Sequence, residues 1–219
     1  MADISRFFDD NSVITRSFTA VFDYFFLGVL TLIGMIPVVT AGASLTALYY
    51  TISRMKEGGA DIAKTFFKAY KANLLQGVGL TFVTIIICSI MGGIYLILRH
   101  PDVFISEGQK ASAAALVAWC IAAVFLFSVI VHFFPLLASY ENTLPQIIKN
   151  SFLITVLHLP SSLFIALVDA LPFLLAYYYR ITLPFAVFYG FCFPSFMNHR
   201  CYDRIFSVIE GKKTADTEP

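Results

Sequence analysis

The chain has 219 residues, of which 58% are hydrophobic and only 13% are charged. Soluble globular domains carry about 25% charged residues, so this composition excludes that class and indicates an integral membrane protein. The formal net charge is +1, and no basic run is long enough to neutralise a row of phosphates, which argues against a nucleic-acid partner.

Residues 1–17 are polar, carry no signal-peptide cleavage pattern and are expected to remain on the cytoplasmic side. An apolar run with Asp23 as its only charge then extends from Phe18 to Arg54. As one helix it would be roughly 50 Å long, whereas a bilayer core is about 30 Å thick. The run must bend, and Pro37 with Gly42 allows it to. We therefore predict spans at 18–36 and 44–55, joined as a tight hairpin.

An amphipathic helix is predicted directly after this hairpin, at 61–73. Asp61 can cap its first turn. Three lysines share one face and aromatic residues share another; these are Lys64, Lys68 and Lys71 against Phe66, Phe67 and Tyr70. The pattern is typical of a helix that lies on a membrane surface. Its polar face could bind lipid headgroups or dock a soluble partner, and the sequence leaves both open.

The rest of the chain predicts four further spans, at 74–98, 111–137, 159–178 and 181–197, and a second interfacial helix at 144–157. The fifth span is expected to kink because it contains Pro172. The fold class is therefore an all-α polytopic bundle of about six membrane helices, forming one domain over 18–210. Residues 211–219 are expected to be a flexible cytoplasmic tail.

Basic residues support an even number of crossings. With six spans, twelve of the fifteen lysines and arginines fall on the side of both termini. With five spans, in which the first apolar run crosses once, the split is ten to five. The positive-inside rule then favours six crossings with both termini cytoplasmic.

The segment PVVTAGASLTALYY at 37–50, followed by TFFKAYKANLLQG at 65–77, resembles the YesL-type family of small bacterial membrane proteins. The turn residues that carry this resemblance include Pro37, Thr40, Gly42, Ser44 and Tyr50. The resemblance implies a multi-pass protein of the bacterial plasma membrane, with no established activity. Because many members are encoded near sugar-import genes, it also implies a part in carbohydrate uptake, with subunits of a sugar ABC importer as partners.

Ionisable residues within spans are functional candidates because burying a charge in hydrocarbon costs at least about 2.5 kcal/mol. Asp169 is the best of them, with His132 and His158 as partners, and Asp23 lies near the start of the first span. Together they could form a polar core for a proton, a cation or sugar hydroxyls. Alternatively, Asp169 is satisfied by a neighbouring helix and only fixes packing, and Asp23 snorkels to the interface.

The turn at 37–42 also has two interpretations. A broken helix can present backbone groups to a substrate, as in transporters. The plainer alternative is a turn that closes the hairpin, with the Thr40 and Ser44 hydroxyls capping its ends. Tyrosines 49, 50 and 177–179 lie at the ends of predicted spans, which is typical of an aromatic belt rather than a sugar site.

No catalytic motif is present, and neither a metal nor a cofactor is predicted. The four cysteines show no ligand spacing, and HRCYD at 199–203 is a weak acid–base or metal pattern. We therefore expect a non-enzymatic accessory or regulatory partner of carbohydrate uptake, whose surface for a partner or headgroups is Lys64, Phe67, Lys68 and Lys71. The alternative is a small homo-oligomeric transporter or channel with a midplane site around Asp169.

Overall fold

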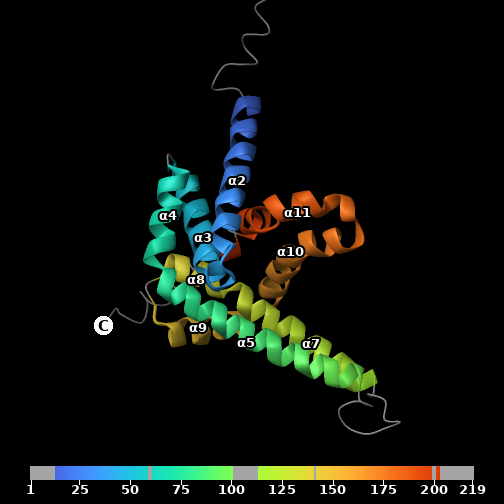
Figure 1. Cartoon of the computed structure of the whole chain (residues 1–219). Coiled ribbons are helices and arrows are strands. Elements are labelled where there is room, and N and C mark those ends of the chain that lie inside the picture. Colours follow the sequence, from blue (N-terminus) through green and yellow to red (C-terminus); the bar gives the residue numbers. More distant parts are fainter. Residues whose placement is uncertain (1–12, 59–60, 101–112, 141, 199–200, 203–219) are drawn as a thin grey trace, which may run out of the picture.

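Helices make up nearly all of the computed structural model, which describes residues 13–58, 61–100, 113–140, 142–198 and 201–202 (Figure 1). Within these ranges there is no strand. The elements in chain order are α2 (Val13–Met35), η1 (Val38–Thr40), α3 (Ala41–Glu57), α4 (Ile62–Ala72), α5 (Leu74–Arg99), α7 (Ala113–Val131), α8 (Phe133–Ser139), α9 (Leu144–Leu157), α10 (Leu159–Tyr178), η2 (Arg180–Thr182) and α11 (Leu183–Tyr189). The all-α class predicted from the sequence is confirmed.

Three helical segments of the described chain are long and apolar enough to cross a membrane: Leu74–Arg99, Ala113–Ser139 and Leu159–Tyr178. They coincide with three of the predicted spans. Thr19–Met35 and Leu144–Leu157 are shorter apolar helices. The protein is thus a membrane protein by the length and composition of its helices, and the number and direction of its crossings stay predictions.

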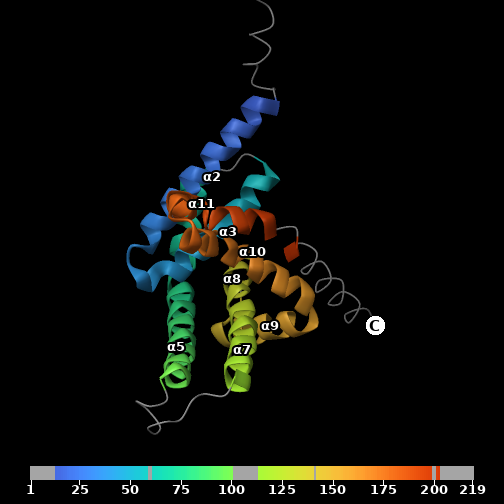
Figure 2. The same cartoon turned by 90° about the vertical axis from the view of Figure 1, so that its right-hand side faces the viewer.

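The far ends of α5 and α7, next to residues 99 and 113, extend together away from the other helices (Figures 1 and 2). Trp119 on α7 joins them, because its indole Nε1 donates to the Met91 carbonyl oxygen at 3.1 Å. Its ring also lies 5.0 Å from that of Tyr95. Most other side chains of these ends are exposed, as expected of spans surrounded by lipid.

The predicted bend between the first two helices is a short turn containing η1. The Thr40 hydroxyl is 2.9 Å from the Gly34 carbonyl oxygen and 2.8 Å from that of Pro37. The Ser44 hydroxyl donates to the Thr31 carbonyl oxygen at 2.7 Å. Both hydroxyls thus satisfy backbone acceptors near the end of α2, where a helix leaves carbonyls without intrahelical partners.

Polar residues contribute to the buried face of α3, which contains the predicted span 44–55. Thr46 and Thr51 are completely buried. Their hydroxyls donate to carbonyl oxygens one turn earlier, those of Gly42 at 2.8 Å and Ala47 at 2.7 Å. A hydroxyl paired within its own helix can be buried without losing its hydrogen bond. This is why α3 lies inside the protein despite its modest hydrophobicity.

Glycines allow α3 to cross α5 at very short range. A Cβ at Gly42 would meet the Gly77 carbonyl oxygen, and a Cβ at Gly77 would meet the Ala43 backbone. The Gly42 amide also donates to the Thr81 hydroxyl at 2.8 Å. Small residues permit such approaches between helices in membranes.

The predicted amphipathic helix is α4, and the Asp61 side chain accepts from the Lys64 amide at 3.2 Å to cap it. Its apolar face is covered by protein. Phe66 is fully buried and Ala69 nearly so, in a cluster with Leu48 and Ile52 of α3. Figure 1 shows α4 beside α3. The apolar face that we expected to meet the membrane surface is therefore largely occupied by the protein's own core.

Two of the predicted later spans are interrupted. The segment 111–137 breaks at His132, between α7 and α8. Pro135 lacks an amide to bond the Val131 carbonyl, and the Tyr202 hydroxyl donates to that carbonyl oxygen at 3.5 Å. The segment 181–197 is divided into η2, α11, a turn at residues 190–191 and a helical stretch at 192–198. It is not one continuous helix.

Candidate functional site

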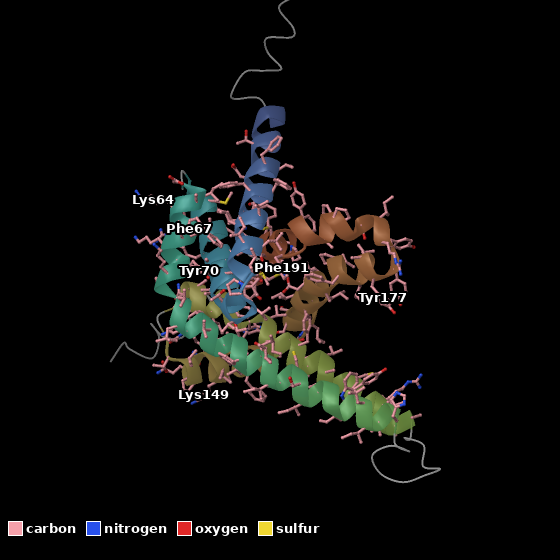
Figure 3. All side chains as sticks on the ribbon, in the orientation of Figure 1. Lys64, Phe67, Tyr70, Lys149, Tyr177 and Phe191 are labelled. Carbon is pink, nitrogen blue, oxygen red and sulfur yellow. The ribbon has the colours of Figure 1, made fainter. Side chains whose placement is uncertain are left out.

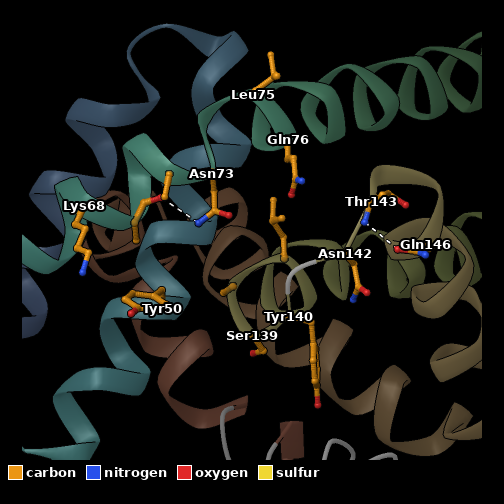
Figure 4. A pocket seen from close by; sticks show the side chains of 14 residues that line it. Tyr50, Lys68, Asn73, Leu75, Gln76, Ser139, Tyr140, Asn142, Thr143 and Gln146 are labelled. Atoms are coloured by element: carbon orange, nitrogen blue, oxygen red, sulfur yellow. Dashed lines mark hydrogen bonds between the residues drawn. The ribbon is translucent and has the colours of Figure 1, made fainter.

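A polar groove of about 740 Å³ lies where the end of α4 meets the start of α5, the end of α8 and the start of α9 (Figure 4). It is lined by Tyr50, Lys68, Ala69, Ala72, Asn73, Leu75, Gln76, Leu137, Ala138, Ser139, Tyr140, Asn142, Thr143 and Gln146. Figure 4 shows two internal hydrogen bonds, from Asn73 Nδ2 to the Ala69 carbonyl oxygen and from the Thr143 amide to Gln146 Oε1. These bonds fix the helix ends that form the groove.

The predicted surface of α4 reaches this groove through Lys68, while Lys64, Phe67 and Lys71 do not line it. Lys64, Lys68 and Lys71 are all exposed, and Phe67 is 45% exposed. Figure 3 shows Lys64 on the outer side of α4, away from the other helices. Lys68 also lines a second hollow of about 390 Å³, together with Arg54 and Lys64. Arg54 is paired with Glu57 at 2.7 Å, so the net charge at this face comes from the lysines.

Asp169, the best intramembrane candidate, has a side-chain partner that the sequence analysis did not identify. Asn198 Nδ2 donates to Asp169 Oδ1 at 3.0 Å and also contacts the Ile165 carbonyl oxygen at 3.4 Å. Asn198 is completely buried, and its Oδ1 has no hydrogen-bond partner among the described residues. This supports the prediction that a neighbouring helix contacts Asp169, but it leaves an unpaired acceptor close to the carboxylate.

Asp169 also lines a cavity of about 190 Å³ between α3, α7, α8, α10 and residues 190–195. The cavity is lined by Leu45, Tyr49, Phe127, Ile130, Val131, Phe134, Asp169, Phe173, Gly190, Phe191 and Ser195. Only Tyr49, Asp169 and Ser195 bring polar side chains to it. Phe191 lies near the centre of the molecule (Figure 3). The cavity is thus an aromatic chamber with one carboxylate.

His132 belongs to a neighbouring polar cluster. Its Nδ1 is 2.6 Å from the Ser128 carbonyl oxygen and its Nε2 is 3.4 Å from the Ser162 hydroxyl. The ring packs edge-on against Tyr202 at 5.7 Å, and Tyr202 packs against Tyr49 at 6.1 Å. His132 is therefore linked to the chamber through two tyrosines, but it does not line it.

The other predicted residues are distributed over the molecule. His158 lies at the junction of α9 and α10. Asp23 is on α2 and is not among the residues lining these three hollows. Of the turn residues, only Tyr50 borders the polar groove and none borders the aromatic chamber. The four candidate ionisable residues thus do not form one site.

Several members of these sites were absent from the sequence predictions. Asn198 follows a run that is otherwise apolar, which was a usable signal for a buried polar partner. Tyr49 was assigned to an aromatic belt, whereas it lines the chamber. Tyr177, Tyr178 and Tyr179 are exposed, as that belt requires.

Within the described residues, no three histidines, cysteines or acidic residues lie together so that they could hold a metal ion. Cys88, Cys120, Cys192 and Cys201 are free thiols. The HRCYD pattern includes His199 and Asp203, which lie outside the described residues.

The hairpin, α4 and most of α5 are the part of the chain with a family match. Residues 19–92 match the family model described as Protein of unknown function, DUF624. No curated protein and no solved structure matches the chain. Over α2–α5, including the glycine crossing and the lysine-bearing helix, the chain is therefore similar to a family of unknown function.

Proposed function

We propose that the protein is a non-enzymatic accessory or regulatory partner of carbohydrate uptake in a bacterial plasma membrane, of the YesL type. In this proposal α4 and the polar groove face the cytoplasm and bind an acidic segment of a sugar ABC importer subunit. Both termini lie on the same side, as the distribution of basic residues favours.

The packing of α4 is the observation that carries this proposal. A headgroup-anchored helix buries its apolar face in the interface, whereas α4 buries Phe66 and Ala69 in the protein core. Membrane contact is not needed to hold it in place. Its three lysines are exposed beside a groove large enough for a peptide segment, an arrangement that suits a protein partner.

Charge indicates the chemistry of that partner. Lysines 64, 68 and 71 lie on one helix face, while the acidic Glu57 is already paired with Arg54. Complementary charges speed association and select among partners. The groove adds amide and hydroxyl side chains from Asn73, Gln76 and Thr143, which can pair with a peptide backbone. The link to sugar import rests on the YesL resemblance of residues 37–50 and 65–77.

The alternative, a small transporter or channel, has weaker support. Its expected parts were Asp169, His132 and the turn at 37–42. Only Asp169 lines the aromatic chamber, and the turn is closed by hydrogen bonds of Thr40 and Ser44 to backbone carbonyls. A cavity of about 190 Å³ also holds too few polar side chains for a sugar's hydroxyls.

Affinity purification of the full chain from its native membrane in gentle detergent tests the proposal. We expect stoichiometric sugar-importer subunits with the wild type and loss of them with Lys68→Glu. The matched control is Lys149→Glu, because Lys149 is an exposed lysine on α9 that lines neither polar hollow. Absence of importer subunits from the wild type, or equal loss with both variants, would contradict the docking role.

A further inference from the structure

The aromatic chamber has one charged group, and that group lacks a countercharge in the described part of the chain. The ion pair among the described residues is Arg54–Glu57, which lies outside the chamber. The Asp169 carboxylate accepts a hydrogen bond from the neutral Asn198. Asp169 is partly buried, and a carboxylate withdrawn from water is costly unless a cation or several donors compensate it. Asn198 adds an unpaired buried acceptor, its Oδ1. The chamber therefore holds a carboxylate with no cationic partner among the described residues, and an unpaired acceptor beside it.

The walls of the chamber define the kind of cation that would fit. Phe127, Phe134, Phe173 and Phe191 line it, and the rings of Phe173 and Phe191 are 5.2 Å apart and inclined by 58°. Inclined aromatic faces bind ammonium ions through cation–π attraction, above all when water is excluded. A bare inorganic cation would need a shell of oxygen ligands, which these apolar walls do not offer.

We propose that this chamber binds a small organic cation, an alkylammonium or quaternary ammonium ion, with Asp169 as its counter-ion. The charged nitrogen lies near the Asp169 carboxylate, and the alkyl groups contact the phenylalanine rings. Tyr49 and Ser195 provide the remaining polar side chains at the wall. This site goes beyond the docking role and uses none of the residues of the polar groove.

Binding of choline, n-butylammonium and benzylammonium to the full chain in lipid nanodiscs tests the proposal by equilibrium dialysis with labelled ligand. We expect at least one cation to bind at a single site per chain. For choline, the neutral isostere 3,3-dimethylbutan-1-ol is the ligand control, and we expect it to compete far more weakly. Failure of all three cations to bind, or equal competition by the neutral isostere, would overturn the proposal.

Two substitutions locate the site. Asp169→Asn keeps the side-chain shape and removes the charge, so the affinity should fall by about tenfold or more. Asp23→Asn is the matched control, because Asp23 is an acidic residue of α2 outside the chamber. The affinity of this variant for the cation should equal that of the wild type. Phe173→Leu keeps an apolar wall without the ring and should weaken binding by roughly threefold to tenfold. Full affinity in both Asp169→Asn and Phe173→Leu, or an equal loss in Asp23→Asn, rules this chamber out as the cation site.

Discussion

Two helices of similar design, α4 and α9, meet very different surroundings. Each begins with a side-chain cap, at Asp61 in α4 and at Thr143 in α9. A single residue separates each from the long helix that follows: Asn73 lies between α4 and α5, and His158 lies between α9 and α10. The two units therefore share an order of capped helix, break and candidate span.

Their exposed faces differ in chemistry. On α4 the exposed side chains include the three lysines, while Phe66 is fully buried. On α9 an exposed lysine, Lys149, is accompanied by several exposed apolar side chains, with Phe152 at 53% and Leu157 at 61%. Figure 3 shows Lys64 on α4 and Lys149 on α9 at separate places on the molecule. The exposed apolar side chains of α9 suit contact with lipid. The exposed lysines of α4, whose Phe66 is buried on the opposite face, suit contact with water.

The comparison teaches that an amphipathic pattern does not identify what covers the apolar face. Both helices were predicted as interfacial from their sequences. Both bury part of that face, α4 with Phe66 on α3 and α9 with Ile147 and Ile154 in a second core cluster. The difference is that α9 also leaves a larger set of apolar side chains uncovered. On α4 the exposed face is therefore mainly the polar one, which suits a protein partner.

Truncation of the buried anchor of α4 should give the largest effect. Phe66→Ala removes a fully buried ring, and such changes cost about 3–5 kcal/mol of unfolding free energy. Phe67→Ala is the control on the same helix, because Phe67 is 45% exposed. Reversible unfolding in mixed micelles measures both. Equal losses would show that the apolar face of α4 is not held by the protein core.

Glycine substitutions should show how tightly helices pack on either side of α5. The α3–α5 crossing lies beside α4, and the contact of α5 with Leu144 lies at the start of α9. Gly42→Ala drives a methyl group into the Gly77 backbone at the α3–α5 crossing, at a cost of about 1–3 kcal/mol. At Gly79 the added methyl would meet only the tip of the Leu144 side chain at the start of α9, so Gly79→Ala should cost less. Gly92→Ala, with nothing within 4 Å, is the control and should be neutral or slightly stabilising. The same unfolding assay ranks the three, and a neutral Gly42→Ala would refute the tight crossing.

Cap substitutions should show where the two helices are alike. Asp61→Ala removes the acceptor of the Lys64 amide, and Thr143→Ala breaks the capping box with Gln146. Each should cost about 1 kcal/mol. Hydrogen exchange of the first-turn amides of α4 and α9 measures the local effect. Unchanged protection in either variant would mean that its cap does not stabilise the helix end.

Sequence patterns predicted the structural features that are determined by residues close together in the chain. The hairpin around Pro37, the Asp61 cap and the long apolar segments all follow from local composition, and the structure contains them. The burial of α3 was harder to predict, because Thr46 and Thr51 look polar until their hydroxyls are paired with their own helix backbone.

Contacts between distant segments account for what the sequence did not predict. Asp169 and Asn198 are 29 positions apart, and no pattern in one sequence pairs them. The break of the last predicted span at Gly190 and Phe191 was hidden within a continuously apolar run. Tyr49 was assigned by its place at a span end, whereas tertiary packing brings it to the chamber.

The most direct test of the central claim is photocrosslinking in the native membrane. A benzoylphenylalanine residue is placed at position 72 on α4 or at position 152 on α9, and the adducts are identified by mass spectrometry. Ala72 is exposed and lines the polar groove, so this change keeps the three lysines. The account predicts a sugar-importer subunit crosslinked at position 72, and lipid without that protein at position 152. Lipid adducts alone at position 72, or the same importer adduct at both positions, would contradict it.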